Sequence, residues 1–273
     1  MTTQELIRQA NALRRRVVGM VYNAGSGHIG GSLSAAEIMA VLYFHEMRID
    51  SENPRRQDRD RFVLSKGHAT PIYYSALAAR GLFPEGELEG FRKFGSILQG
   101  HPDRKHIPGV DMSSGSLGQG VSAAVGMALA AKLKGEDWRV YALLGDGEIQ
   151  EGQVWEACML SAHRKLDNLC VIIDNNDVQS DGRIGEVNSP YPIDKKLEAF
   201  NFNVICVDGH DIPALVAAFE AARREKGRPT AIIAQTVKGK SVSFMEGQAA
   251  WHGKVPNAEE YALAMEELER AGV

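Results

Sequence analysis

The sequence has few cysteines, no excess of basic residues and no long apolar run. Its three cysteines, Cys158, Cys170 and Cys206, lack the close spacing typical of metal or redox sites, and an odd number cannot all form disulfides within the chain. Unpaired thiols are typical of a reducing environment, so we expect a cytoplasmic protein.

Charge and hydropathy argue against two classes of partner. The 31 Lys and Arg residues are outnumbered by 35 Asp and Glu, which gives a net charge of −4 and no basic surplus to displace the counterions of nucleic acid. The most apolar stretch, residues 123–131, is far shorter than the roughly 20 residues of a membrane span. The first residues lack the basic and apolar segments of a signal peptide. We therefore expect no contact with nucleic acid or membrane.

Apolar strands alternate with helical patterns along the chain. Helices are predicted over 3–22, 34–47, 117–133, 151–165, 212–225 and 258–271, and strands over 61–65, 139–144, 169–173, 203–207 and 230–236. Ser34 and Glu37 have the spacing of a capping box at the start of the second helix. Residues 81–116, rich in Gly and Pro, are expected to form a long functional loop region.

This alternation predicts an α/β fold with a doubly wound, mainly parallel sheet and helices on both faces. The sequence contains no linker, repeat or low-complexity tract. We therefore expect residues 1–273 to form a single domain.

Two glycine motifs resemble nucleotide-binding signatures without meeting their structural requirements. Residues 25–30 match the dinucleotide pattern G-x-G-x-x-G, but a helix precedes them where that pattern requires a strand. Residues 238–241, Lys-Gly-Lys-Ser, resemble the end of a P-loop, yet Ala234 stands where its first glycine should be. A polar loop after a strand explains the second segment better, unless another motif assigns it a role.

Polar residues follow two consecutive predicted strands. Gly145-Asp146-Gly147 ends one strand, and Asn175-Asn176 ends the next. A crossover of this length brings the carboxyl ends of adjacent parallel strands together, and such ends bind ligands in open α/β sheets. An Asp carboxylate and an Asn amide oxygen are hard ligands suited to Mg²⁺ or Ca²⁺ bridging a diphosphate. Either motif alone is more often structural, but the ordered pair at this spacing is far more specific.

With these motifs, the chain resembles the transketolase family of thiamine-diphosphate enzymes. Five segments occur in the family's order: residues 23–28 (Asn-Ala-Gly-Ser-Gly-His), 61–68 (Arg-Phe-Val-Leu-Ser-Lys-Gly-His), 100–102 (Gly-His-Pro), 115–120 (Gly-Ser-Leu-Gly-Gln-Gly) and 145–152 (Gly-Asp-Gly-Glu-Ile-Gln-Glu-Gly). The resemblance runs from about residue 5 to 255 and covers only the family's amino-terminal, diphosphate-binding domain. The pyrimidine-binding and carboxy-terminal domains of a full transketolase are missing.

The resemblance implies roles for individual residues. Asp146 and Asn176 would ligate the metal, with the backbone carbonyl of Val178 as a third ligand. His68 and His252 would bracket the diphosphate of the cofactor. The remaining implied cofactor contacts are Gly115, Ser116, Leu117, Gly145, Gly147 and Glu151, of which Glu151 matches the glutamate that contacts the cofactor-activating partner across the subunit interface.

The resemblance implies that four histidines are catalytic. In ketol transfer, protons leave the donor's hydroxyl and reach the acceptor's oxygen near neutral pH, which is the range where histidine titrates. The four histidines are His28 and His101, which would face the substrate's hydroxyls and carbonyl, together with His68 and His252. We expect structural or surface roles for the other lone histidines His45, His106 and His163. His210 is explained equally well by a helix-capping turn.

The missing domains imply a partner. In this family a pyrimidine domain of another chain supplies the glutamate that activates the cofactor, so the resemblance implies the amino-terminal subunit of a split transketolase. Its partner would be a separate chain of roughly 300 residues, carrying the pyrimidine-binding and carboxy-terminal domains, in an α2β2 assembly that acts on sugar phosphates.

Two alternatives remain open. One is a specialised transferase that acts on a branched or sulfonated ketose, because the residues that hold the far end of the sugar lie outside this chain. The other is a non-catalytic thiamine-diphosphate-binding module, which would have little need for His28, His68 and His101 together. An enzyme that makes deoxyxylulose phosphate fits less well, since residues 100–102 and 115–120 look more like transketolase.

Overall fold

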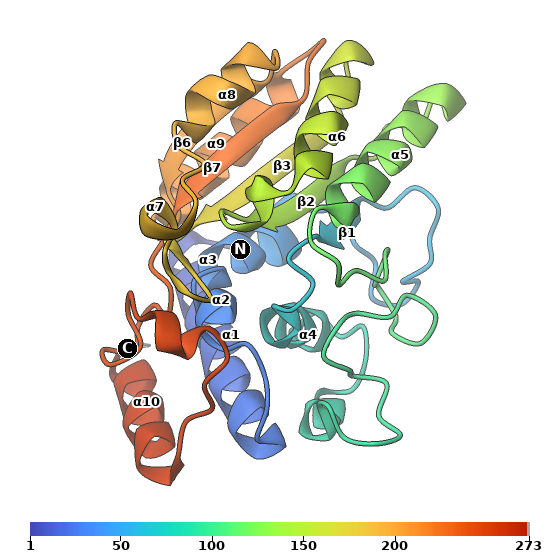
Figure 1. Cartoon of the computed structure of the whole chain (residues 1–273). Coiled ribbons are helices and arrows are strands. Elements are labelled where there is room, and N and C mark those ends of the chain that lie inside the picture. Colours follow the sequence, from blue (N-terminus) through green and yellow to red (C-terminus); the bar gives the residue numbers. More distant parts are fainter. Residues whose placement is uncertain (272–273) are drawn as a thin grey trace.

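The computed structural model describes residues 1–271 and contains a five-stranded, wholly parallel sheet (Figure 1). The strand order is β1-β2-β3-β7-β6, and the first three neighbours are also consecutive in the chain. The strands are β1 (Arg61–Leu64), β2 (Val140–Gly145), β3 (Leu169–Asn175), β6 (Asn203–Asp208) and β7 (Thr230–Gln235). A short antiparallel hairpin, β4 (Val178–Gln179) with β5 (Gly182–Arg183), follows β3.

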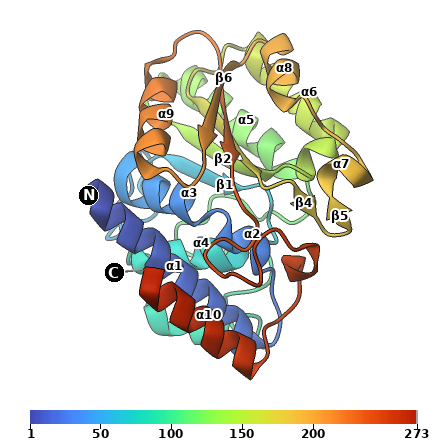
Figure 2. The same cartoon turned by 90° about the vertical axis from the view of Figure 1, so that its left-hand side faces the viewer.

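Helices cover both faces of the sheet, as the alternating pattern predicts. One face is covered by α5 (Gln119–Lys134), α6 (Gly152–His163) and α8 (Ile193–Ala199). The other is covered by α1 (Thr3–Ala24), α3 (Ala36–Val41), α4 (Thr70–Ala79) and α9 (Ile212–Arg224). Figure 2 shows these two layers with α10 (Ala258–Ala271) lying beside α1.

Successive residues of the strands point into two separate cores. In β2, Tyr141 and Leu143 pack with α1, α3 and α4, whereas Ala142 and Leu144 pack with α5 and α6. A strand buried on both faces needs an unbroken apolar run, which is the pattern that the sequence shows here. The doubly wound α/β prediction is therefore confirmed.

The remaining elements are short and lie mainly in the connections near the carboxyl edge of the sheet. They are α2 (Gly30–Leu33), η1 (Leu42–Glu46), η2 (Glu85–Gly90), η3 (Glu148–Gln150), α7 (Ile184–Val187) and η4 (Ala249–His252). Between α4 and α5 the structure contains only η2, so residues 81–116 form the long loop region that was expected.

The capping box predicted at Ser34 and Glu37 is wrong. Ser34 ends α2 in helical geometry, and its hydroxyl donates to the Asp174 carboxylate at 2.6 Å. Glu37 is buried, and its carboxylate accepts hydrogen bonds from both Nη atoms of Arg14, each at 2.6 Å. These long-range polar contacts replace the local cap. A capping box that the sequence pattern had not suggested forms between Thr2 and Glu5 at the start of α1.

Glu37 makes the stability of the fold sensitive to acid. Burial opposes its charge, but Arg14 and His210 outweigh burial and lower the pKa of Glu37 to about 2. A carboxylate with a lowered pKa stabilises the fold at pH values above its unfolded pKa of about 4.5 and loses that contribution as the pH falls toward 2.

We expect urea unfolding of the wild type to show a loss of about 3 kcal/mol over this interval that Glu37→Gln does not show. The control is Glu85→Gln, which removes a carboxylate from an exposed pair with Arg16 and leaves the acid dependence nearly unchanged. Equal acid dependence in the wild type and Glu37→Gln would contradict the assignment.

Candidate active site

The carboxyl ends of β2 and β3 lie side by side, as the two polar motifs predict. Gly145 pairs with Asp174, so Asp146 and Asn176 follow directly on neighbouring strands. The Asp146 carboxylate is 3% exposed and accepts the backbone N–H groups of Gly147 at 2.8 Å and Asp177 at 2.6 Å. The two motifs therefore form one site at this edge.

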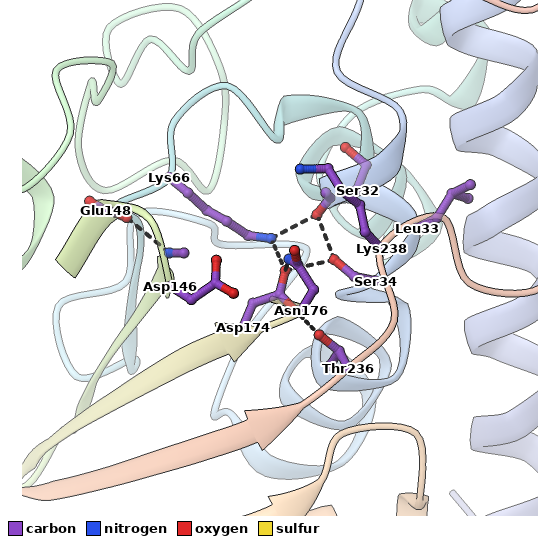
Figure 3. A network of polar contacts seen from close by, with 12 residues as sticks. Ser32, Leu33, Ser34, Lys66, Asp146, Glu148, Asp174, Asn176, Thr236 and Lys238 are labelled. Carbon is purple, nitrogen blue, oxygen red and sulfur yellow. Dashed lines mark hydrogen bonds and ion pairs between the residues drawn. The ribbon is translucent and has the colours of Figure 1, made fainter. Parts of the chain in front are cut away.

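A buried charge network lies directly beneath this edge (Figure 3). The Lys66 ammonium donates to the Asp174 carboxylate at 2.5 Å and to the Gly31 carbonyl at 2.7 Å. The hydroxyls of Ser34 and Thr236 also donate to Asp174. Burial disfavours the carboxylate, but these partners outweigh it and keep the pKa of Asp174 below its ordinary value.

The surroundings of Asp146 shift its pKa in the opposite direction. Its desolvation and the neighbouring Asp174 carboxylate raise the pKa of Asp146 to about 7, although two backbone amides favour the charged form. A bound cation would relieve this unfavourable concentration of negative charge.

Glu148 joins three loops of the site and was not anticipated from the sequence. One of its carboxylate oxygens accepts the Ser65 hydroxyl at 2.5 Å and the Gly118 amide at 2.9 Å, and the other accepts the Gly145 amide at 3.1 Å. Its burial raises the pKa of this carboxyl. These bonds hold the glycine-rich loop at 115–118 against the end of β2.

Three of the four predicted histidines meet in one cluster. The ring centroid of His28 lies 5.0 Å from that of His68 and 5.3 Å from that of His252, and His68 and His252 are 5.2 Å apart. His101 packs against the glycine-rich loop, because a Cβ atom on Gly115 would lie 3.3 Å from its ring. The structure therefore brings histidines from four separate segments of the chain to one site.

The imidazoles of this cluster are poor bases. Burial, reinforced by neighbouring cations and by other histidines, lowers the pKa of both His28 and His252 to about 4. The pKa values of His68 and His101 are also lowered, with burial as the main cause. All four rings are thus neutral near pH 7, and each can offer one hydrogen-bond donor and one acceptor.

Lys238 connects the segment after β7 with both the predicted metal loop and the histidines. Its ammonium donates to the Val178 carbonyl at 2.7 Å and contacts Nδ1 of His252 at 2.9 Å. Burial lowers its pKa to about 8. The segment at 238–241 is therefore part of the site and not only a polar loop. The helix α1 that precedes residues 25–30 confirms that they are not a dinucleotide motif.

Two further predicted residues have clear positions. Glu151 is exposed at the start of α6 and lies close to the glycine-rich loop. A Cβ atom added to Gly118 would lie 2.9 Å from the Cβ atom of Glu151. His210 is structural, because it contacts the Glu37 carboxylate at 2.9 Å and accepts the Val237 amide.

The donors at the carboxyl edge fit a divalent cation held mainly by oxygen. They are the Asp146 carboxylate, the Asn176 amide oxygen and the Val178 carbonyl, and the ammonium of Lys238 already contacts the last of these. Among residues 1–271 no three His, Cys, Asp or Glu side chains form a metal-binding group. Two of the three oxygen donors at the carboxyl edge are an amide and a backbone carbonyl, which are ordinary ligands of Mg²⁺ and Ca²⁺.

The helices of the described chain include none with the length and apolar character needed to cross a membrane. All three cysteines are free thiols, with Cys158 and Cys170 buried and Cys206 exposed.

The sequence matches one family model over nearly its whole length. Residues 6–270 match "Transketolase, thiamine diphosphate binding domain". The chain is 44% identical over 268 residues to the 6-deoxy-6-sulfo-D-fructose transketolase subunit of Clostridium sp. strain MSTE9, with 98% of each chain covered. It is 41% identical over 268 residues to an apulose-4-phosphate transketolase subunit of Phocaeicola vulgatus, covering 98% of this chain and 95% of that one.

A solved structure shows the same fold. The transketolase of Campylobacter jejuni superposes with a TM-score of 0.93 at 37% identity, over 98% of this chain and 43% of that one. The chain thus spans less than half of this transketolase, but nearly all of the two relatives named as subunits.

Proposed function

The chain belongs to the family of transketolase thiamine-diphosphate-binding domains, and we propose that it is the amino-terminal subunit of a split transketolase. It binds thiamine diphosphate with a divalent cation and transfers a two-carbon ketol unit from a ketose phosphate to an aldose. The main support for this proposal is that Asp146, Asn176 and four histidines lie together at one edge of the sheet.

We propose that Asp146, Asn176 and the Val178 carbonyl hold Mg²⁺ or Ca²⁺. The backbone at 115–117, with Gly145 and Gly147, would contact the cofactor, and His68 and His252 would bracket its diphosphate. When bound, thiamine diphosphate supplies the nucleophilic carbon and the electron sink for breaking the donor's C2–C3 bond. Lys238, which contacts both Val178 and His252, is positioned to offset the charge of the diphosphate.

His28 and His101 act on the sugar. Their rings are neutral near pH 7 because burial lowers both pKa values. Neutral imidazoles can hydrogen-bond to the donor's hydroxyls and carbonyl, and a ring whose substrate-facing nitrogen carries no proton can also accept a proton during C2–C3 cleavage. Four neutral rings in one site suit the handling of hydroxyl-rich substrates, and a module that only binds the cofactor would not require them.

The second subunit supplies the pyrimidine-binding and carboxy-terminal domains in an α2β2 assembly. This proposal rests on length, since the chain covers 43% of a solved transketolase but at least 95% of two relatives named as subunits. Exposed Glu151 is the contact to the partner. The helices α5 and α6 also expose large apolar side chains, including Leu133 and Met159 at 79% and 63% exposure, which suits a subunit interface.

Residues 1–273 act as a single diphosphate-binding domain, and the unpaired thiols suit a cytoplasmic enzyme. The names of the two relatives point to a branched or sulfonated ketose as an alternative substrate. Assays with 6-deoxy-6-sulfo-D-fructose, apulose 4-phosphate and xylulose 5-phosphate as donors would separate these possibilities.

Calorimetry of the isolated chain with thiamine diphosphate and Mg²⁺ tests whether the site is placed correctly. We expect saturable binding that EDTA abolishes. Failure to bind the cofactor both alone and with the second subunit would contradict the proposal.

Replacing His101 with alanine separates substrate handling from cofactor binding. We expect His101→Ala to retain thiamine diphosphate and, with the second subunit present, to lose about 100-fold in donor turnover. The matched control is His106→Ala, which removes an exposed histidine of the same loop and leaves turnover unchanged. Equal loss of cofactor in His101→Ala and in an Asp146 variant would contradict this division of roles.

A further inference from the structure

Arg92 lies beside the histidine cluster, and neither the sequence motifs nor the proposed function assigns it a role. It follows η2 in the long loop region, and its guanidinium reaches the loop that carries His28. Nη1 donates to the Ser26 hydroxyl at 2.6 Å, and Nη2 lies 3.4 Å from Nδ1 of His28. Arg92 thus connects two loops of the site that are more than sixty residues apart in sequence.

The surrounding backbone is shaped to hold this guanidinium in place. Arg92 has a φ angle of 57°, in the left-handed region that a residue with a side chain rarely adopts, and its amide donates to the Leu98 carbonyl at 2.8 Å. A Cβ atom on Gly100 would lie 2.9 Å from Nη2 of Arg92, so a side chain at position 100 would displace the guanidinium from this place. Gly100 directly precedes His101, which places Arg92 between two substrate-facing histidines.

The chemistry of arginine then determines how the His28 ring is protonated. A guanidinium keeps its charge in proteins and can only donate hydrogen bonds. Nδ1 of His28 must therefore be the acceptor in this contact. Burial, with Arg92, His101 and Lys238 as further causes, lowers the pKa of His28 to about 4, so the ring is neutral near pH 7. The single ring proton of a neutral imidazole whose Nδ1 accepts is carried on Nε2.

We propose that Arg92 is a positioning residue that fixes His28 in its Nε2–H form, so that His28 donates a hydrogen bond to an oxygen of the sugar substrate. This inference rests on the proposed function for the identity of the substrate. In this form His28 holds a substrate oxygen and cannot take a proton from it through Nε2. Removal of the donor's hydroxyl proton therefore falls to another group of the site.

The protonation of His28 can be measured without any enzymatic activity. We would record ¹⁵N spectra of the imidazole nitrogens in the isolated chain near pH 7, with His28→Gln to assign the His28 signals. We expect an unprotonated Nδ1 and a protonated Nε2 in the wild type, and a mixture of both tautomers in Arg92→Asn. Asparagine tolerates the left-handed backbone at this position, so this variant is expected to fold. A protonated Nδ1 in the wild type, or an unchanged tautomer in Arg92→Asn, would overturn the proposal.

Kinetics with the second subunit give an independent test. We expect Arg92→Asn to lower kcat/KM for the ketose donor about tenfold or more while the affinity for thiamine diphosphate changes less than about twofold. Arg92→Lys, which keeps a donor beside Nδ1, should recover part of the loss. The control Arg16→Gln breaks an exposed ion pair with Glu85 and should leave kcat/KM unchanged.

An unchanged kcat/KM in Arg92→Asn would overturn the role of Arg92 in substrate binding, and so would an equal loss of cofactor affinity. If the wild-type pair shows no ketol transfer, the proposed function fails, and the ¹⁵N measurement still decides whether Arg92 fixes the tautomer.

Discussion

Replacing Asp146 with alanine is expected to lower the affinity of the chain for thiamine diphosphate and Mg²⁺ at least about 100-fold. The variant removes the one carboxylate of the proposed ligand set and leaves only the Asn176 amide and the Val178 carbonyl. Without that charge, a cation would have little to compensate for its lost hydration, and the proposed site would hold the diphosphate much more weakly. Calorimetric titration with the cofactor in the presence of Mg²⁺ measures the effect.

Asp146→Ala should still fold. The substitution removes two acceptors for backbone amides, but it also removes a buried negative charge beside Asp174. The matched control is Asp137→Ala, which removes an exposed carboxylate near the opposite end of β2. We expect the control to bind cofactor normally. Normal binding by Asp146→Ala, or an equal loss in both variants, would show that the site is placed wrongly.

Replacing Lys66 with methionine is expected to destabilise the fold by about 3–5 kcal/mol. Lys66 and Asp174 are 2% and 0% exposed and are joined at 2.5 Å. Methionine keeps the length of the side chain but leaves the Asp174 carboxylate buried without its cation. The free energy of unfolding from urea denaturation measures the loss.

A double variant shows whether the unpaired charge is the cause. Lys66→Met combined with Asp174→Asn removes both charges and keeps a side chain that can bond Ser34 and Thr236, so it should be clearly more stable than Lys66→Met alone. The control Lys195→Met breaks an exposed pair with Glu198 and should cost less than about 1 kcal/mol. A double variant as unstable as Lys66→Met would contradict the explanation.

The positions of Asp146 and Asn176 could be predicted because they depend on strand order alone. Each residue directly follows an apolar run, and consecutive runs with a crossover between them become parallel neighbours. The pairing of Gly145 with Asp174 confirms this reasoning. The four histidines were found differently, from their order in a known family, and their spacing in the chain gives no sign that they meet.

The supporting residues of the site could not be predicted, because their partners are distant in the sequence. Lys66 bonds a carboxylate 108 residues away, Glu148 bonds a hydroxyl 83 residues away, and Lys238 bonds a carbonyl 60 residues away. Only the packed fold brings such groups together. The same contacts explain the wrong capping box, since Asp174 takes up the hydroxyl of Ser34. A local pattern could not reveal that competing partner.

Ketol transfer by the chain alone and by the chain mixed with its second subunit shows whether this chain is one half of a split transketolase. The assay follows transfer from xylulose 5-phosphate to ribose 5-phosphate with thiamine diphosphate and Mg²⁺, first with this chain and then with an equimolar amount of the second subunit that carries the pyrimidine-binding and carboxy-terminal domains. The split-transketolase account predicts turnover only in the mixture, and none in a mixture that contains Asp146→Ala. Turnover by this chain alone would contradict the account.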